Sequence, residues 1–441
     1  MATLARAEAA DVNAFLEMVS RSCKRRKYNK SKVPVFQTRG QIVAYSSPDS
    51  TYAVTKKFLD EAKASILIGI YDFTAQYMKE LLIKAMRRGV RVSLMLDLDG
   101  RTGETDLFNE LVKYGCEGVP APSCANKEVS YFASSHEKVI VVDGEWTLVQ
   151  SGNWTDNSIP QNESDGGDPR QFVPGNRDMG IAIKSEPLAS YFTRILRSDI
   201  KLEQAGAHIE GLPPGLAELQ EIDLLEAAPK ALPIKLFPSK RFNPAKDLKV
   251  VPVLTPDNYV DVIPSWLATA RKSIFIEEQY IRGGQTEIGA ILAGIAKTMK
   301  ANPGLDVRII LARPFPGKRF DKEGAEIRQL GPKFGLKLGA NVRILNPKRF
   351  VHCHNKLIIV DGQSVLVSSQ NWSDTAVLTN REAGLLLFYP EVARYFAAIF
   401  DGDWTSGLKT LPKKTNGIFF APESLGTGKT VRLAWGDYEE V

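Results

Sequence analysis

The segment His136-Glu137-Lys138-Val139-Ile140-Val141-Val142-Asp143-Gly144 decides the fold, because it recurs as His354-Asn355-Lys356-Leu357-Ile358-Ile359-Val360-Asp361-Gly362. Both copies read H-x-K-x4-D-G and run through β-branched residues typical of a strand. Fifteen residues after each histidine stands a second shared motif, Ser151-Gly152-Asn153-Trp154 in one copy and Ser369-Gln370-Asn371-Trp372 in the other. The chain has four histidines, so two motif pairs at equal spacing indicate a duplication rather than chance.

The duplication extends outward from these motifs. Pro48-Asp49 and Pro256-Asp257 lie 208 residues apart, and the strand-like runs that begin at Ser65 and Ser273 have the same offset. An amphipathic helical pattern and a further apolar strand follow in each copy. Strands that alternate with helices predict an α/β fold, with a largely parallel or mixed sheet in each half.

Composition shifts divide the chain. Proline density after Gly211 breaks regular structure and predicts a connector between the two copies. We expect a basic N-terminal segment at 1–42, a first lobe at 43–205, a Pro-rich linker at 206–247, a second lobe at 248–405 and a C-terminal tail at 406–441.

The overall composition is that of a globular protein. Of 441 residues, 44% are hydrophobic and 24% charged, which excludes a disordered, collagenous or coiled-coil chain. No apolar run approaches the roughly 18 residues of a transmembrane helix. Met1–Ser20 has no apolar signal-peptide core, so we expect a cytoplasmic or peripheral-membrane protein, unless a secretory signal has been removed. The net charge of +6 fits anionic partners without specifying nucleic acid or membrane.

The four cysteines are Cys23, Cys116, Cys124 and Cys353. Their spacing contains no CxxC pair and does not suit a four-cysteine zinc site. A disulfide framework is not expected in a chain of this size, although a single bridge between Cys116 and Cys124 stays open.

The strand period places the polar residues of each copy on one patch. Residues at i and i+2 share a face, so His136 and Lys138 point the same way, as do Ser and Asn of the following motif. A hairpin at Asp143-Gly144 would bring the two strands together. Asp143 and Asp361 lie seven residues after their histidines, an odd offset, so we expect them in turns or salt bridges and not in direct catalysis.

Together the copies supply a set of groups that suits a phosphodiester. Two ammonium groups and two carboxamides can hold the anion without a metal or another cofactor, and we assign this role to Lys138, Lys356, Asn153 and Asn371. One neutral imidazole can attack phosphorus while a protonated one supplies a proton to the leaving oxygen. Each copy has one such histidine, so the two halves must face each other across a shared site.

This pattern resembles the duplicated His-Lys-Asp signature of the phospholipase D superfamily, from roughly Val43 to Trp404. The resemblance implies two similar α/β/α sandwich lobes with pseudo-twofold symmetry, an active site at their interface and a covalent phosphohistidine intermediate. It implies His136 as the nucleophile and His354 as the general acid. It also implies that an acidic residue after each Ser-x-Asn orients a catalytic histidine, and the supporting residues are then Ser151, Ser369, Asp178 and Glu382, with Asp143 and Asp361.

Several functions are compatible with these residues. The first is a phospholipase D-type hydrolase that releases phosphatidic acid from a phospholipid at a membrane surface, with transfer to an alcohol as a side reaction. The stretch Glu277–Ile281, which looks like its counterpart in lipid-acting members, favours this reading. A metal-independent nuclease would use the same residues, and a cardiolipin-synthase-like phosphatidyltransferase is a further alternative. A scaffold that only binds phosphate would not need both imidazoles. We expect a monomer.

The copies differ in one loop. Asn153 and Asp178 are 25 residues apart, whereas Asn371 and Glu382 are 11 apart. The extra length falls in the polar, Gly-Pro-rich stretch Ile159–Pro169, which we expect near the mouth of the site. It is either a lid or specificity loop, or a solvated insertion without a role.

Overall fold

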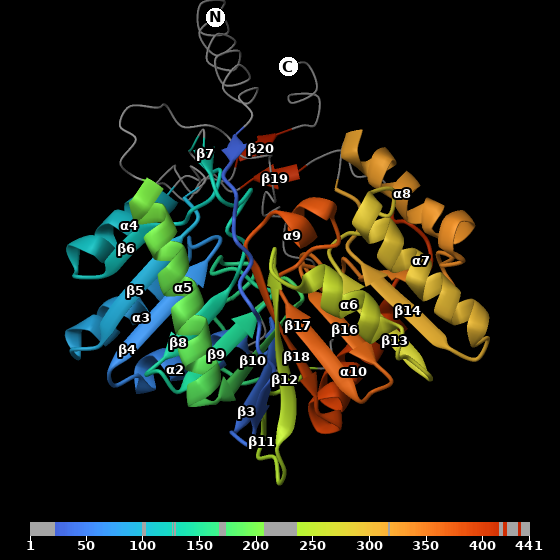
Figure 1. Ribbon diagram of the computed structural model, residues 1–441. Helices are drawn as coiled ribbons and strands as arrows, with labels where there is room; N and C mark the ends of the chain where they lie inside the picture. The colour runs from blue at the N-terminus through green and yellow to red at the C-terminus, as the bar shows by residue number, and fades with distance from the viewer. Residues whose placement is uncertain are drawn as a thin grey trace, which may run out of the picture.

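A computed structural model describes residues 23–98, 103–125, 127, 129–166, 173–206, 236–315, 318–413, 418–420 and 431–433. Within these residues the chain forms two eight-stranded sheets that stand side by side, with helices packed on both faces of each sheet (Figure 1). The predicted α/β class and the two similar lobes are confirmed.

The first sheet has the strand order β11-β3-β10-β9-β8-β4-β5-β6. Strands β4, β5 and β6 run parallel, because helices connect them, and β8, β9 and β10 form antiparallel pairs. The strands are β3 (Ile42–Ser47), β4 (Ser65–Ile70), β5 (Arg91–Leu96), β6 (Glu117–Pro120), β8 (Val139–Val142), β9 (Trp146–Gln150), β10 (Asp178–Lys184) and β11 (Lys240–Phe242). The helices of this lobe are α2 (Thr51–Glu61), α3 (Gln76–Arg87), α4 (Glu104–Lys113) and α5 (Glu186–Gly206).

The second sheet repeats this plan in the order β15-β14-β13-β16-β17-β18-β12-β2. Its strands are β2 (Phe36–Thr38), β12 (Leu248–Thr255), β13 (Ser273–Glu278), β14 (Asp306–Leu311), β15 (Val342–Ile344), β16 (Lys356–Val360), β17 (Ser364–Ser368) and β18 (Glu382–Phe388). The helices are α6 (Tyr259–Leu267), α7 (Thr286–Ala301), α8 (Lys318–Phe334), α9 (Asp374–Leu378) and α10 (Pro390–Ser406). Two small ladders pair β1 (Lys24–Arg25) with β7 (Val129–Ser130), and β19 (Ile418–Phe420) with β20 (Val431–Leu433).

Each sheet takes an edge strand from outside its expected lobe. Strand β2, which falls in the expected N-terminal segment, pairs with β12 of the second sheet. Strand β11, which falls in the expected linker, pairs with β3 of the first sheet. The boundaries at residues 42 and 247 therefore leave out one strand of each sheet, because such three-residue edge strands have no periodicity that sequence can reveal.

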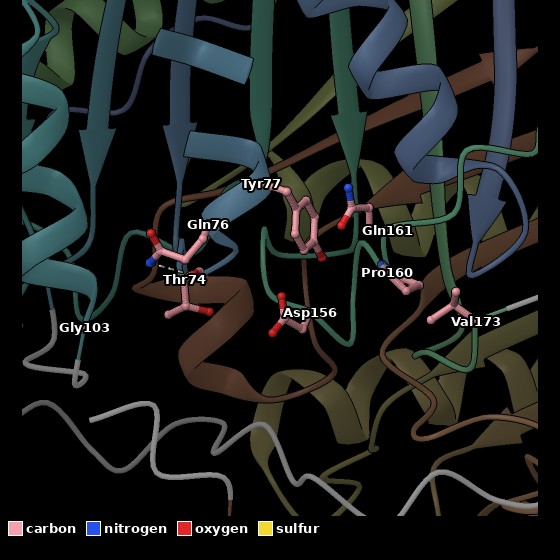
Figure 2. Close-up of a pocket in the computed structure, with 8 residues that line it drawn as sticks. All are labelled: Thr74, Gln76, Tyr77, Gly103, Asp156, Pro160, Gln161 and Val173. Atoms are coloured by element: carbon pink, nitrogen blue, oxygen red, sulfur yellow. Dashed lines mark hydrogen bonds between the residues drawn. The ribbon is translucent and has the colours of Figure 1, made fainter. Parts of the chain in front are cut away.

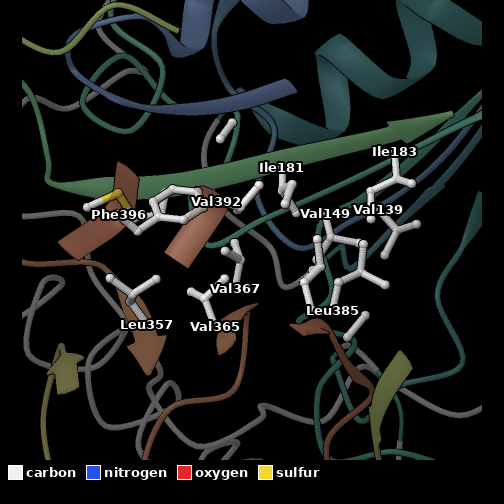
Figure 3. Packing of buried hydrophobic residues seen from close by; sticks show 14 of the residues in the cluster. Val139, Val149, Ile181, Ile183, Leu357, Val365, Val367, Leu385, Val392 and Phe396 are labelled. Carbon is white, nitrogen blue, oxygen red and sulfur yellow. The ribbon is translucent and has the colours of Figure 1, made fainter. Parts of the chain in front are cut away.

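A continuous apolar core joins the two lobes. It packs inward-facing residues of β8, β9 and β10 with residues of β16, β17, β18 and helix α10. Figure 3 shows the contact region, with Val149 and Ile181 of the first sheet, Val367 and Leu385 of the second, and Phe396 of α10. Because apolar burial is the main favourable term in folding, this shared core holds the lobes as one body.

The bridge between Cys116 and Cys124 that the sequence left open does not form. Cys23 forms a disulfide with Cys124, across a sequence separation of 101 residues, and not Cys116. Cys116 is a buried free thiol within the apolar core of the first lobe. The bridge ties the segment before β2 to the loop that leads toward His136. Among the described residues, no helix is long and apolar enough to cross a membrane.

Candidate active site

The two motif histidines lie where the lobes meet. His136 lies three residues before β8 and His354 two residues before β16. Both side chains are buried, at 1% and 2% exposure. The backbone N–H of His136 donates to the carbonyl of Arg381, at 2.7 Å, and that of His354 donates to the carbonyl of Arg177, at 3.0 Å. Each histidine segment is thus fixed to the opposite lobe, directly beside the acidic residue of that lobe.

The acidic residues are exchanged between the lobes. Glu382, at the start of β18, places Oε2 2.8 Å from Nδ1 of His136. Asp178, at the start of β10, places Oδ1 2.9 Å from Nδ1 of His354. Both ion pairs join residues of different lobes, so each imidazole depends on the other half of the duplication.

The motif serines hold these carboxylates. Ser151 donates to Asp178 Oδ1 at 2.7 Å, and Ser369 donates to Glu382 Oε2 at 2.5 Å. Serine and the acidic residue come from neighbouring strands of one lobe, which explains why each serine recurs beside its asparagine. The hydroxyls thus fix the carboxylates in place.

A carboxylate lies within hydrogen-bond distance of Nδ1 of each ring. The carboxylate accepts the Nδ1 proton, which leaves Nε2 as the chemically active nitrogen. Burial raises the pKa of Asp178, but the nearby His354 and Lys356 charges and the Ser151 hydroxyl outweigh burial and hold that pKa below its usual value. An ionised Asp178 can accept a charge-assisted hydrogen bond from Nδ1 of His354.

The motif lysines turn back toward the histidines. Lys138 Nζ donates to the carbonyl of His136 and Lys356 Nζ donates to the carbonyl of His354, each at 2.8 Å. Both lysines are buried, at 1% exposure. The Lys138 ammonium also lies 5.3 Å from the centre of the Tyr71 ring, which packs against the His136 ring. An ammonium group carries three donor hydrogens, so each lysine can bond more than one acceptor.

The motif asparagines differ between the lobes. Asn153 Nδ2 donates to Asp72 Oδ2 at 2.8 Å, so a buried carboxylate fixes this carboxamide. Sequence reasoning missed Asp72, which lies two residues after the end of β4. The 208-residue offset puts Tyr280 at the matching position of the second lobe. Asn371 is buried at 3% exposure beside Trp372, whose indole donates to the Tyr259 hydroxyl at 2.9 Å.

Asp143 and Asp361 lie away from the histidines. Each sits at a hairpin with a positive φ, of 54° and 56°. Asp143 accepts from the backbone N–H groups of residues 63, 64 and 65, and Asp361 does the same for residues 271, 272 and 273. The geometry is that of a turn residue that fixes the start of β4 or β13.

Two buried arginines were also missed. Arg177 contacts Asp49 and Asp403, and Arg381 contacts Asp257 and Asp199, in four ion pairs of 2.5 to 2.8 Å. In each set one aspartate belongs to the arginine's own lobe and the other to the partner lobe. The recurrence of Pro-Asp and of Asn-Arg before the acidic residue was the available signal.

The described part of the lobe-one insertion is packed in place. The Tyr77 hydroxyl donates to the carbonyl of Ile159 at 2.8 Å. Asp165 accepts from the N–H and hydroxyl of Ser239, at 2.8 and 2.6 Å. Residues 167–169 of the expected loop lie outside the described residues. Among described side chains, no group of three His, Cys, Asp or Glu could hold a metal ion.

A known protein family matches the chain in two regions, one in each lobe. Residues 55–200 and 264–404 match the family described as "Cardiolipin synthase, PLD-like domain". The chain belongs to this phospholipase D-like family. The resemblance read from the duplicated motif is confirmed, and the two matched regions lie within the two lobes.

More specific likenesses are partial. The chain is similar to the human mitochondrial cardiolipin hydrolase, at 29% identity over 110 residues, which is 24% of this chain and 43% of that protein. The dog protein of the same name is 28% identical over 105 residues. The chain thus spans less than half the length of these curated relatives. The phosphatidylserine synthase of Haemophilus influenzae shares the fold, with a TM-score of 0.58, 14% identity, and coverage of 87% of this chain and 91% of that one.

Proposed function

We propose that the protein cleaves the headgroup phosphodiester of a phospholipid through a phosphohistidine intermediate. The observation that carries the proposal is the pair of buried histidines, each held at Nδ1 by a carboxylate of the opposite lobe. Two imidazoles oriented in this way are the requirement for double displacement at phosphorus. A lipid substrate is supported by the matched family, described as a cardiolipin synthase domain, and by the curated relatives named cardiolipin hydrolases.

The reaction proceeds in two steps. In the first, Nε2 of His136 forms a bond to phosphorus while the bond from phosphorus to the leaving oxygen breaks. The Nε2 proton of His354 passes to that oxygen, so the alcohol leaves neutral. The His354 ring, now neutral, is held by the ionised Asp178.

In the second step water attacks the phosphohistidine. His354 takes the proton of the attacking oxygen as the phosphorus–nitrogen bond breaks, which restores both rings and releases phosphatidic acid. Lys138, Lys356, Asn153 and Asn371 would hold the phosphoryl oxygens, because charge on them grows in the transition state. Asp178 and Glu382 act as positioning residues for the imidazoles.

The second candidate is a phosphatidyltransferase. The attacking oxygen in the second step can belong to an alcohol as well as to water, and the matched family is described by a synthase. Cleavage of nucleic acid by the same residues is the third outcome to test.

One assay separates these reactions. Phosphatidylcholine and phosphatidylglycerol vesicles with added ethanol would be compared with single- and double-stranded DNA, all in EDTA. We expect phosphatidic acid together with phosphatidylethanol. DNA cleavage without lipid turnover would instead assign the same residues to a nuclease, and restoration of activity only by divalent ions would remove the metal-free account.

Variants test the roles of the histidines. His136→Ala and His354→Ala should each lower lipid turnover by about 10³-fold, whereas His208→Ala, outside both motifs, is the control. With bis(4-nitrophenyl) phosphate the leaving group needs no proton. His354→Ala should then accumulate covalent phosphoenzyme, visible by mass spectrometry, and His136→Ala should not. Lipid turnover within tenfold of wild type in either His136→Ala or His354→Ala would contradict the mechanism.

A further inference from the structure

The segment before β2 passes from the first lobe to the second. It begins at Cys23, which is joined by a disulfide to Cys124, and its strand β1 pairs with β7 in the loop that leads to His136. It ends in β2, an edge strand of the second sheet. We call residues 23–38 the N-terminal strap. Figure 1 shows this strap in blue, along the line where the two lobes meet.

The middle of the strap is fixed to Arg381. A guanidinium nitrogen of Arg381 donates to the Tyr28 hydroxyl at 3.1 Å, and this hydroxyl donates to Asp257 at 3.2 Å. The backbone N–H of Ser31 donates to the same carboxylate at 2.6 Å. The rings of Tyr28 and Phe132 lie 5.0 Å apart, and the Arg381 guanidinium lies 5.2 and 4.9 Å from their centres. The strap thus belongs to the ion-pair cluster of Arg381.

Arg381 connects the strap to the proposed nucleophile. Its carbonyl accepts from the N–H of His136 at 2.7 Å, and its own N–H donates to the carbonyl of Ser134 at 2.8 Å. The next residue, Glu382, holds Nδ1 of His136 at 2.8 Å. These bonds fix the direction of Nε2, so a shift of Arg381 would turn the imidazole away from phosphorus. Attack depends steeply on such alignment.

The disulfide fixes the strap to the loop that carries His136. The N–H of Cys124 donates to the carbonyl of Phe132 at 2.9 Å, and the N–H of Arg26 donates to the carbonyl of Ser130 at 2.6 Å. Phe132 lies four residues before His136. The strap and this loop are therefore joined at three places, which are the disulfide, the β1–β7 ladder and the pair of rings at Arg381.

The matching contacts of the second histidine are not covalent. The N–H of His354 donates to the carbonyl of Arg177, whose guanidinium lies 4.1 Å from the centre of the Phe350 ring. The N–H of Phe237 donates to Asp49 at 3.3 Å, as the strap donates to the corresponding aspartate of the other lobe. Within the described residues the disulfide thus supports the His136 side of the pseudo-symmetric site.

The asparagine motif of the first lobe is held by residues of its own lobe. Asn153 donates to Asp72 at 2.8 Å. Figure 2 shows Tyr77 of α3 beside Asp156 and Pro160, which follow Asn153 in the sequence and line a cavity of about 480 Å³. Because these contacts lie within the first lobe, loosening of the strap should leave the group that holds the phosphate in place.

The disulfide is within reach of a reductant. Cys23 is partly exposed, whereas Cys124 is 5% exposed. Reduction begins with attack of a thiolate on one sulfur, and the exposed cations Lys24, Arg25 and Lys27 attract that anion. A dithiol supplies two electrons and two protons: the sulfur–sulfur bond breaks, both cysteines become thiols, and the dithiol closes to a cyclic disulfide.

We propose that the N-terminal strap positions His136 for attack on phosphorus, and that reduction of its disulfide by a dithiol reversibly slows this step. The inference rests on the proposed function and adds a redox regulation of the same site. Tyr28 is a positioning residue, because it acts on His136 through Arg381.

Formation of phosphoenzyme in the His354→Ala variant tests the inference. With bis(4-nitrophenyl) phosphate this variant should stop at the phosphohistidine, so both the rate constant and the final amount can be measured by mass spectrometry. In dithiothreitol we expect the rate constant to fall about tenfold. The final amount and the substrate concentration at half-maximal rate should stay within about twofold, and reoxidation should restore the rate constant.

Further variants in this background separate the parts of the strap. Cys23→Ser combined with Cys124→Ser should be slow with or without dithiothreitol. Cys116→Ala, which removes a buried free thiol, should respond to dithiothreitol as its parent does. Tyr28→Phe removes the hydroxyl that Arg381 contacts and should slow phosphoenzyme formation about fivefold with the disulfide intact. Tyr131→Phe, in the loop before His136, is the matched control and should not.

The outcomes separate the two proposals. A rate constant that stays within about twofold on reduction would overturn the inference, as would a Tyr28→Phe variant as fast as its parent. A smaller final amount at an unchanged rate constant would show that reduction only unfolds part of the protein, and would also overturn it. If the oxidised His354→Ala variant forms no phosphoenzyme, the proposed function itself fails, and the inference fails with it.

Discussion

Replacing Glu137 by glutamine should change how the free energy of unfolding depends on pH. Glu137 lies between His136 and Lys138, faces the opposite side of the strand and is 2% exposed. The Ser135 hydroxyl donates to its oxygens at 3.1 and 3.0 Å, and the carbonyl oxygen of glutamine can accept this hydrogen bond. Burial and, to a lesser extent, the charge of Asp199 raise the pKa of Glu137 from 4.5 to about 8.

The sign follows from proton binding. Between pH 4.5 and 8 the folded protein keeps the Glu137 proton while the unfolded chain loses it, so rising pH favours the unfolded chain. With 1.36 kcal/mol per pKa unit, burial of Glu137 lowers the free energy of unfolding by about 1 kcal/mol at pH 5 and by about 5 kcal/mol at pH 8.5. Glu137→Gln removes this titration. As the pH rises from 5 to 8.5, its free energy of unfolding should therefore increase by about 4 kcal/mol relative to that of wild type.

Urea unfolding at pH 5 and pH 8.5 measures the effect. The difference in free energy of unfolding between variant and wild type is taken at each pH, since acids that do not interact with Glu137 titrate equally in both proteins. Glu163→Gln, at an exposed position of the lobe-one insertion, removes the same charge outside the core and should show no such change. A difference between variant and wild type that stays constant within about 1 kcal/mol would refute the reasoning.

Two further predictions concern the contacts between segments. Arg381→Met leaves Asp199 and Asp257 buried without their cation, so it should lower the free energy of unfolding by about 3–5 kcal/mol in urea. A loss under about 1 kcal/mol would show that these ion pairs do not hold the interface. Replacing both Cys23 and Cys124 by serine removes a link across 101 residues and should cost about 2–4 kcal/mol, measured as a lower melting temperature. An unchanged melting temperature after reduction of the wild-type protein would contradict a stabilising role of this disulfide.

The sequence was most informative about what recurs within each copy. The strand period and the 208-residue offset were sufficient to predict two α/β lobes. The same period predicted that Asp143 faces away from His136, and the structure has Asp143 in a turn that binds the start of β4.

Contacts between the copies could not be read in this way. A repeat shows that an acidic residue follows each asparagine motif, but not that Asp178 serves the histidine of the other lobe. The Cys23–Cys124 bridge could not be predicted for the same reason, because 101 residues separate its cysteines. Asp72 does not recur in the second copy, where Tyr280 takes its position. The comparison of the two copies therefore did not indicate it as a site residue.

The exchange of carboxylates between lobes has a consequence for synthesis on the ribosome. Asp178 precedes its partner His354 by 176 residues, and Asp199 precedes Arg381 by 182. At typical elongation rates the first lobe waits roughly 10 to 40 seconds for these partners. In the first part of that interval, until Lys240–Phe242 is made, the edge of β3 also lacks β11. The nascent chain holds one imidazole without its carboxylate, and the two-histidine site becomes complete only after Glu382 has emerged.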